Sequence, residues 1–151
     1  MSITIVGLDG GPLGERAVAG LADADLVVGW PRHIDLVAGH VPAAAEQVVI
    51  DRDLDATLAL LRERSGRRVV LASGDPGFFG IVRAVAAEHD DVAVVPAVSS
   101  VAAAFAAAGI SWDDAQVVSA HGRAPERAVA VCRRLSKVAV LTEPAFGPAE
   151  L

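Results

Sequence analysis

The stretch RVVLASGDPGFFG, residues 68–80, decides the fold class of this chain. Residues 69–72 form a continuous apolar run, a pattern typical of a strand that is buried on both faces. The turn residues Gly74, Pro76 and Gly77 follow at once and end the strand. A buried strand that runs directly into such a turn indicates a parallel sheet, in which ligands bind beyond the carboxyl ends of the strands.

Outward from this stretch, strand-like and helix-like runs alternate along the chain. The expected strands are residues 3–8, 26–28, 48–50, 68–72, 92–95, 116–120 and 138–142, and the expected helices are 15–21, 54–64, 79–88, 99–108 and 125–135. This order predicts an α/β fold, with a mostly parallel sheet covered by helices on both faces. We expect a first domain over residues 1–111, which carries the cofactor and substrate loops, and a truncated second α/β domain over residues 112–151.

Composition narrows the functional classes. The net charge of −6 provides no overall basic footprint for nucleic acid. The single cysteine, Cys132, excludes an internal disulfide and a multi-cysteine zinc site, and no histidine pair has metal-ligand spacing, so we expect no metal. The most apolar stretch, residues 92–110, is broken by Pro96 and Gly109, and the N-terminus has no secretory signal. We therefore expect a cytoplasmic protein that does not bind membranes.

Three turn segments follow strands and are candidates for ligand binding. They are residues 7–14, 73–80 and 96–100. In the middle segment Asp75 could accept hydrogen bonds from an ammonium group or from hydroxyls, or it could cap the next helix. In the third segment Ser99 or Ser100 could contact a polar ligand, although either could simply be the N-cap of the helix that follows.

Two Arg-His pairs also follow strands. Arg32 and His33 come after the second strand, and His121 and Arg123 come after the sixth. Arginine binds carboxylates in a bidentate way, and histidine adds directional hydrogen bonds. A single pair of this kind is usually solvated loop charge, but two pairs after strands favour a shared anion site.

Together these segments resemble the tetrapyrrole methylase family. That family has a Gly-x-Gly-Pro-Gly loop after the first strand, a Gly-Asp-Pro loop near the middle and a Pro-Gly-x-Ser/Thr-Ser/Ala segment soon after. They stand here at residues 7–11, 74–76 and 96–100, in matching order and spacing. Asp9 and Gly10 replace the family's Gly and Pro in the first loop.

Other residues resemble the subfamily that methylates carbon 5 of the corrin ring, in precorrin-6Y or cobalt-precorrin-7. They are Gly29-Trp30-Pro31-Arg32-His33, Ser99-Ser100-Val101, Trp112-Asp113-Asp114-Ala115 and Ser119-Ala120-His121-Gly122-Arg123. The resemblance implies an S-adenosylmethionine-dependent methyltransferase of cobalamin biosynthesis, with S-adenosylhomocysteine as product. It leaves open whether the ring carries cobalt and whether a carbon-15 methylating, decarboxylating domain accompanies the chain.

The resemblance also implies roles for single residues. It places the cofactor against Gly10, Ser73, Gly74, Asp75, Phe78, Ser99, Ser100 and Thr142. Arg32, His33 and Arg123 are candidates for holding the carboxylates of a precorrin, and His121 is the candidate general base. The family commonly forms homodimers, so a homodimer is expected. Two alternatives stay open: a methyltransferase of the same fold that acts on RNA or protein, and a non-catalytic cofactor-binding fragment.

Overall fold

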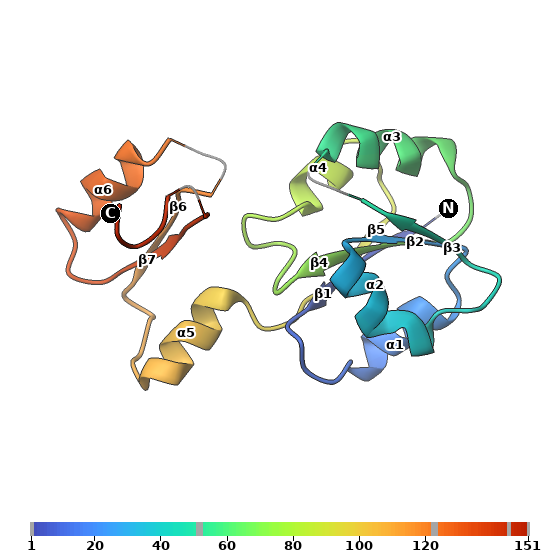
Figure 1. Cartoon of the computed structure of the whole chain (residues 1–151), viewed down its shortest axis with the longest axis horizontal. Coiled ribbons are helices and arrows are strands. Elements are labelled where there is room, and N and C mark those ends of the chain that lie inside the picture. The colour runs from blue at the N-terminus through green and yellow to red at the C-terminus, as the bar shows by residue number, and fades with distance from the viewer. Residues whose placement is uncertain (1, 51–52, 122–123, 145, 151) are drawn as a thin grey trace. The chain divides into compact units, whose positions relative to one another are not determined.

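The computed structural model describes residues 2–50, 53–121, 124–144 and 146–150. The chain forms two compact units, residues 1–99 and residues 100–151 (Figure 1). The division at residue 111 that the sequence predicted remains a prediction. By compactness, residues 100–111 group with the second unit.

The first unit is built on a five-stranded sheet. Its elements are β1 (Ile3–Leu8), α1 (Glu15–Ala22), β2 (Leu26–Gly29), α2 (Pro31–Val37), a 3-10 turn η1 (Ala38–His40), β3 (Glu46–Val49), α3 (Leu54–Glu63), β4 (Arg68–Ser73), α4 (Val82–Ala86) and β5 (Val92–Val95). The strand order is β3-β2-β4-β1-β5, and every pairing is parallel. The central strands β4 and β1 are the two longest, as expected for strands buried on both faces.

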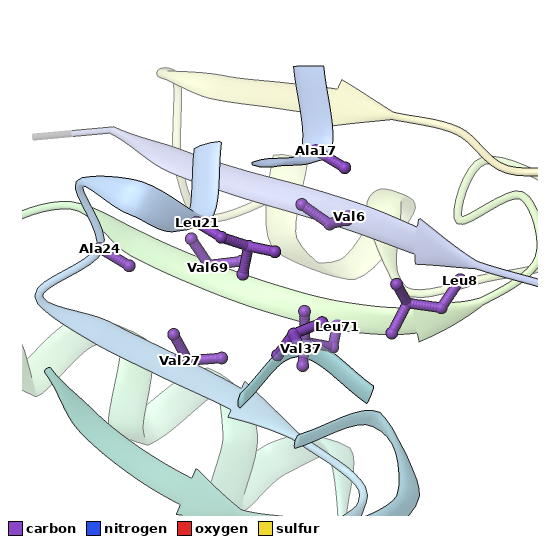
Figure 2. Packing of buried hydrophobic residues seen from close by; sticks show 9 residues of the cluster. All are labelled: Val6, Leu8, Ala17, Leu21, Ala24, Val27, Val37, Val69 and Leu71. Carbon is purple, nitrogen blue, oxygen red and sulfur yellow. The ribbon is translucent and has the colours of Figure 1, made fainter. Parts of the chain in front are cut away.

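Helices cover both faces of this sheet, as the sequence predicted (Figure 1). Side chains alternate along each strand, so successive residues enter different cores. In β1, Val6 packs in the cluster with Leu21 of α1, whereas Ile5 packs in the cluster with Leu61 of α3. Figure 2 shows the first cluster, where α1 and the end of α2 lie over the strands.

The second unit contains α5 (Ser100–Ala108), β6 (Gln116–Ser119), α6 (Glu126–Cys132) and β7 (Val138–Leu141). β6 and β7 pair in parallel, from Gln116 opposite Val138 to Ser119 opposite Leu141. Its small core comprises Val118, Ala120 and Ala128, with Val131, Val138, Val140 and Phe146 packed against them. A β-α-β unit of this kind is what the alternation of patterns predicts after residue 112.

Several elements differ from the predictions: β3 begins two residues earlier, α6 ends three residues earlier, and the short turn η1 was not predicted. Two further differences concern α2 and α4. The helix α2 was not predicted; its signal is Pro31 at the first helical position. The helix predicted over 79–88 is α4, which begins only at Val82. It starts late because Phe79 has a positive φ of 55° and the turn continues through Gly80. Within the described residues no helix is long and apolar enough to cross a bilayer.

Candidate functional site

Three loops meet beyond the carboxyl ends of β1, β4 and β5. The N–H of Gly74 donates to the carbonyl of Leu8 at 2.7 Å, and the carbonyl of Gly74 accepts from the N–H of Ala97 at 3.3 Å. Gly74 has a φ of 62°, a region that glycine enters without steric cost. The three segments singled out in the sequence are therefore joined through the backbone of one glycine.

Gly7 shows how closely these loops approach. A Cβ atom on Gly7 would lie 2.0 Å from the carbonyl oxygen of Gly74 and 2.7 Å from the nitrogen of Ala97. Both neighbours are backbone atoms, which cannot swing aside as a flexible side chain can. Only glycine fits at residue 7, and this explains a glycine at the end of an otherwise apolar, β-branched strand.

Asp9 ties the first loop to the third. Its carboxylate accepts from the N–H of Gly11 at 2.9 Å and from the N–H of Val98 at 3.3 Å. The hydrogen bonds from Gly11 and then Val98 hold the pKa of the Asp9 carboxyl below its usual value. Asp9 was not among the predicted ligand residues. Its signal was present in the Asp-Gly-Gly sequence, because an aspartate before glycines commonly accepts from the backbone two residues on.

Asp75 and the two phenylalanines shape the middle loop. The Asp75 carboxylate accepts from the N–H of Gly77 at 2.8 Å, and its carbonyl accepts from the N–H of Phe78 at 3.0 Å. Asp75 is therefore not the cap of the next helix, whose N-cap is Ile81. The rings of Phe78 and Phe79 meet edge to face, with centroids 5.1 Å apart. The second carboxylate oxygen of Asp75 has no bonded partner within the described part of the chain.

Ser73 meets the Arg32-His33 pair at the end of β4. Arg32 Nη2 donates to Ser73 Oγ at 2.9 Å, and His33 Nε2 lies 3.0 Å from the same oxygen. Arg32 Nε also lies 3.4 Å from His33 Nε2. A predicted cofactor residue and two predicted substrate residues, about 40 positions apart in sequence, thus form one polar cluster. They meet because β2 and β4 are neighbours in the parallel sheet.

His33 and Arg32 differ in exposure. The ring of His33 is buried, with 4% of the residue exposed, whereas Arg32 is exposed. Burial of the ring, and then the charge of Arg32, lowers the pKa of His33. A neutral His33 beside a charged, exposed Arg32 leaves the guanidinium as the group able to meet an anionic ligand.

The remaining predicted residues lie in several places. Gly10 is exposed in the first loop with a φ of 87°, and Ser99 is half-buried at the end of the first unit. Ser100, His121 and Thr142 belong to the second unit, where His121 is exposed. Arg123 lies outside the described residues. In the described ranges, no group of three or more His, Cys, Asp or Glu side chains is placed to hold a metal.

Comparison with known proteins identifies the family. The model of the Tetrapyrrole (Corrin/Porphyrin) Methylases matches residues 3–151. The chain belongs to this family. It is 33% identical to a cobalt-precorrin-7 C(5)-methyltransferase of Salmonella typhimurium, over 99% of the chain and 75% of that protein. It is 31% identical to a decarboxylating precorrin-6Y C(5,15)-methyltransferase of Sinorhizobium, over 99% of the chain but only 37% of that protein.

Solved structures share the fold. The methyltransferase CobJ superposes with a TM-score of 0.69 at 24% identity, over 87% of the chain and 62% of CobJ. The precorrin-6Y methylase of Archaeoglobus fulgidus superposes with a TM-score of 0.64 at 25% identity, over 83% of the chain and 67% of that protein. The predicted tetrapyrrole methylase fold is confirmed.

Proposed function

We propose that this chain belongs to an S-adenosylmethionine-dependent C-methyltransferase that acts on carbon 5 of a precorrin in cobalamin biosynthesis. The observation that carries the proposal is the 33% identity to a cobalt-precorrin-7 C(5)-methyltransferase, which extends over 99% of the chain. The chain spans 75% of that relative and 62% of CobJ. The methyltransferase activity of the whole enzyme is therefore proposed for this chain.

The residues at the end of β4 suit the proposed cofactor. S-adenosylmethionine carries an ammonium group and ribose hydroxyls, which are hydrogen-bond donors. Asp75 has one carboxylate oxygen bonded to Gly77 and a second without a partner in the described ranges, so it can accept from such donors. Gly7 and Gly74 let the backbones of the loops approach closely there.

The proposed cofactor contacts of the other predicted residues follow the same family pattern. Ser73, Gly74 and Phe78 would line the cofactor beside Asp75, and Gly10 would lie at the first loop. Ser99, Ser100 and Thr142 complete this proposed set. When bound, the cofactor supplies an electrophilic methyl group.

The chain's own contribution to the reaction is positioning. A ring carbon conjugated with nitrogen is already nucleophilic, so holding it in line with the methyl group can account for up to ~7–11 kcal/mol of barrier lowering. Arg32, and with it Arg123, would bind the acceptor's carboxylates. His121, exposed after β6, is the candidate base if a proton is removed by the protein. A homodimer and a cytoplasmic location remain predictions.

A methyl-transfer assay tests the reaction. The 151-residue chain is incubated with cofactor labelled in its methyl group and with cobalt-precorrin-7 or precorrin-6Y, and the corrinoid is analysed by mass spectrometry. We expect one labelled methyl group per ring, and a strong loss of product with Asp75→Asn, which keeps an oxygen for Gly77 but removes the charge. The matched control is Asp90→Asn. Asp90 is exposed and precedes the amino end of β5, away from the carboxyl ends where the loops meet, so this variant should retain activity.

The assay also separates the alternatives. Label found on RNA or protein, and none on the ring, would support a relative of the same fold with another acceptor. Cofactor binding without transfer to any acceptor would support a non-catalytic cofactor-binding fragment. Either result would overturn the proposed reaction.

A further inference from the structure

The cluster of Arg32, His33 and Ser73 has a definite hydrogen-bond direction. Arg32 Nη2 is always a donor, so Ser73 Oγ accepts at 2.9 Å and its own hydroxyl proton must point elsewhere. The neighbouring His33 Nε2, at 3.0 Å, can accept that proton. Arg32 Nε–H is directed at the same Nε2, at 3.4 Å.

These contacts select one form of the His33 ring. Two donors, the Ser73 hydroxyl and Arg32 Nε–H, face Nε2, so Nε2 is the nitrogen without a proton and Nδ1 carries it. Nδ1 has no hydrogen-bond partner within the described residues, so no contact at Nδ1 favours the tautomer that carries the proton on Nε2. The lowered pKa of His33 agrees with a neutral ring.

We propose that His33 is a positioning residue: through the Ser73 hydroxyl it holds the Arg32 guanidinium at the carboxyl end of β4, where the guanidinium binds a carboxylate of the ligand. His33 does not itself bind the ligand, because it is 4% exposed. This inference rests on the proposed function, and it gives His33 an indirect role in place of the direct carboxylate contact that the family resemblance implies.

The geometry leaves one edge of the Arg32 guanidinium available for that carboxylate. Nε and Nη2 form one edge of the planar group, and this edge faces His33 and Ser73. On the other edge, formed by Nη1 and Nη2, Nη1 has no bonded partner within the described ranges of the chain. Two parallel N–H donors on that edge match the two oxygens of a carboxylate. Fixing the long side chain beforehand also lowers the entropy lost on binding.

The tautomer is tested by long-range 1H–15N NMR of the imidazole nitrogens, with His33→Gln used to assign the signals. We expect a neutral His33 ring at pH 7, with Nδ1 protonated and Nε2 unprotonated. Protonation on Nε2 would overturn the positioning role. This measurement needs no ligand, so it stands even if the proposed reaction fails.

The ligand side is tested with an octacarboxylate porphyrin, uroporphyrin, titrated by fluorescence, and with its methyl ester as the uncharged probe. Losing a charge-assisted hydrogen-bonded pair should weaken uroporphyrin binding by about 10- to 100-fold in Arg32→Gln. Arg67→Gln is the matched control, since Arg67 precedes β4, at the amino end of that strand, and pairs with Asp23. Equal effects of the two changes, or tight binding of the ester, would overturn the carboxylate site.

Variants at His33 test whether it acts through Ser73 and Arg32. We expect His33→Leu and Ser73→Ala to weaken uroporphyrin binding several-fold, and His33→Gln to restore most of it, because an amide oxygen can accept from Ser73. In the Arg32→Gln background, His33→Leu should add almost nothing. If His33→Leu weakened uroporphyrin binding as much in the Arg32→Gln background as in the wild type, and the double variant still melted cooperatively, His33 would have only a structural role. S-adenosylhomocysteine binding, measured on the same variants, reports separately on the proposed cofactor site.

Discussion

The carboxylate of Asp9 accepts a hydrogen bond from the N–H of Val98, 89 residues further along the chain, at 3.3 Å. The same carboxylate accepts from Gly11 at 2.9 Å, so one side chain fixes the first loop and joins it to the third. Here an aspartate carboxylate bridges two of the loops that follow neighbouring strands, β1 and β5.

Asp9→Ala should lower the thermal midpoint at pH 7, because two backbone donors lose their acceptor. The pKa of Asp9 is lowered in the folded state, so its contribution is complete above the unfolded pKa of about 3.9 and is lost as the pH falls through the lower folded value. The difference in midpoint between the wild type and Asp9→Ala should therefore shrink below about pH 4. A difference that is the same at pH 3 and pH 7 would contradict this account.

Gly7→Ala should destabilise the first unit by about 1–3 kcal/mol or prevent its folding, as overpacking does. The added Cβ would fall 2.0 Å from the carbonyl of Gly74. Gly39→Ala is the control, since nothing lies within 4 Å of its Cβ position. Urea unfolding followed by circular dichroism measures both. A wild-type midpoint for Gly7→Ala would show that the loops are not packed as described.

Leu61→Ala should cost about 2–5 kcal/mol of unfolding free energy, because it empties a fully buried position in the core beneath α3. The same change at Leu54, on the same helix but 43% exposed, should cost much less. The two variants are compared by urea unfolding. Similar costs would mean that this face of α3 does not cover the sheet.

His33 should make the fold acid-sensitive in a defined range. Its folded pKa is lowered, chiefly by burial and then by Arg32, so the folded state binds fewer protons than the unfolded state below about pH 6.5. Stability should fall as the pH decreases from there toward the lowered pKa. In His33→Gln this fall should be smaller, as measured by urea midpoints from pH 7 to pH 5. Identical pH profiles would mean that His33 titrates as it does in the unfolded chain.

Much of the fold could be predicted because β1, β2, β4 and β5 are largely apolar runs bounded by turn residues. The edge strand β3 begins with the polar residues Glu46 and Gln47, and its start was predicted two residues late. The range 92–95 was predicted with its bounds, and α1 and α3 differ by one residue at one end. The helix α2 was missed although Pro31 stands at its first position, and the late start of α4 depends on the positive φ of Phe79. Neither feature leaves a strong mark on hydrophobic spacing.

The sequence named candidate site residues, whose roles remain predictions, but it did not show how they connect. The sequence indicated Arg32, His33 and Ser73 as separate candidates, because it does not specify that β2 and β4 are adjacent. Their shared hydrogen bonds follow from strand order, which is set by tertiary packing. The contact of Asp9 with Val98 was missed for the same reason, because the sequence does not specify that β1 and β5, which precede these two residues, are adjacent. The roles of His121, Thr142 and Arg123 remain predictions.

Calorimetric titration of S-adenosylhomocysteine into the 151-residue chain tests the central claim most directly. The account predicts saturable 1:1 binding in the micromolar range, weakened at least tenfold by Asp75→Asn and unchanged by the control Asp90→Asn. Binding that is absent from the wild type, or that is equally strong in Asp75→Asn, would contradict a cofactor site at the end of β4.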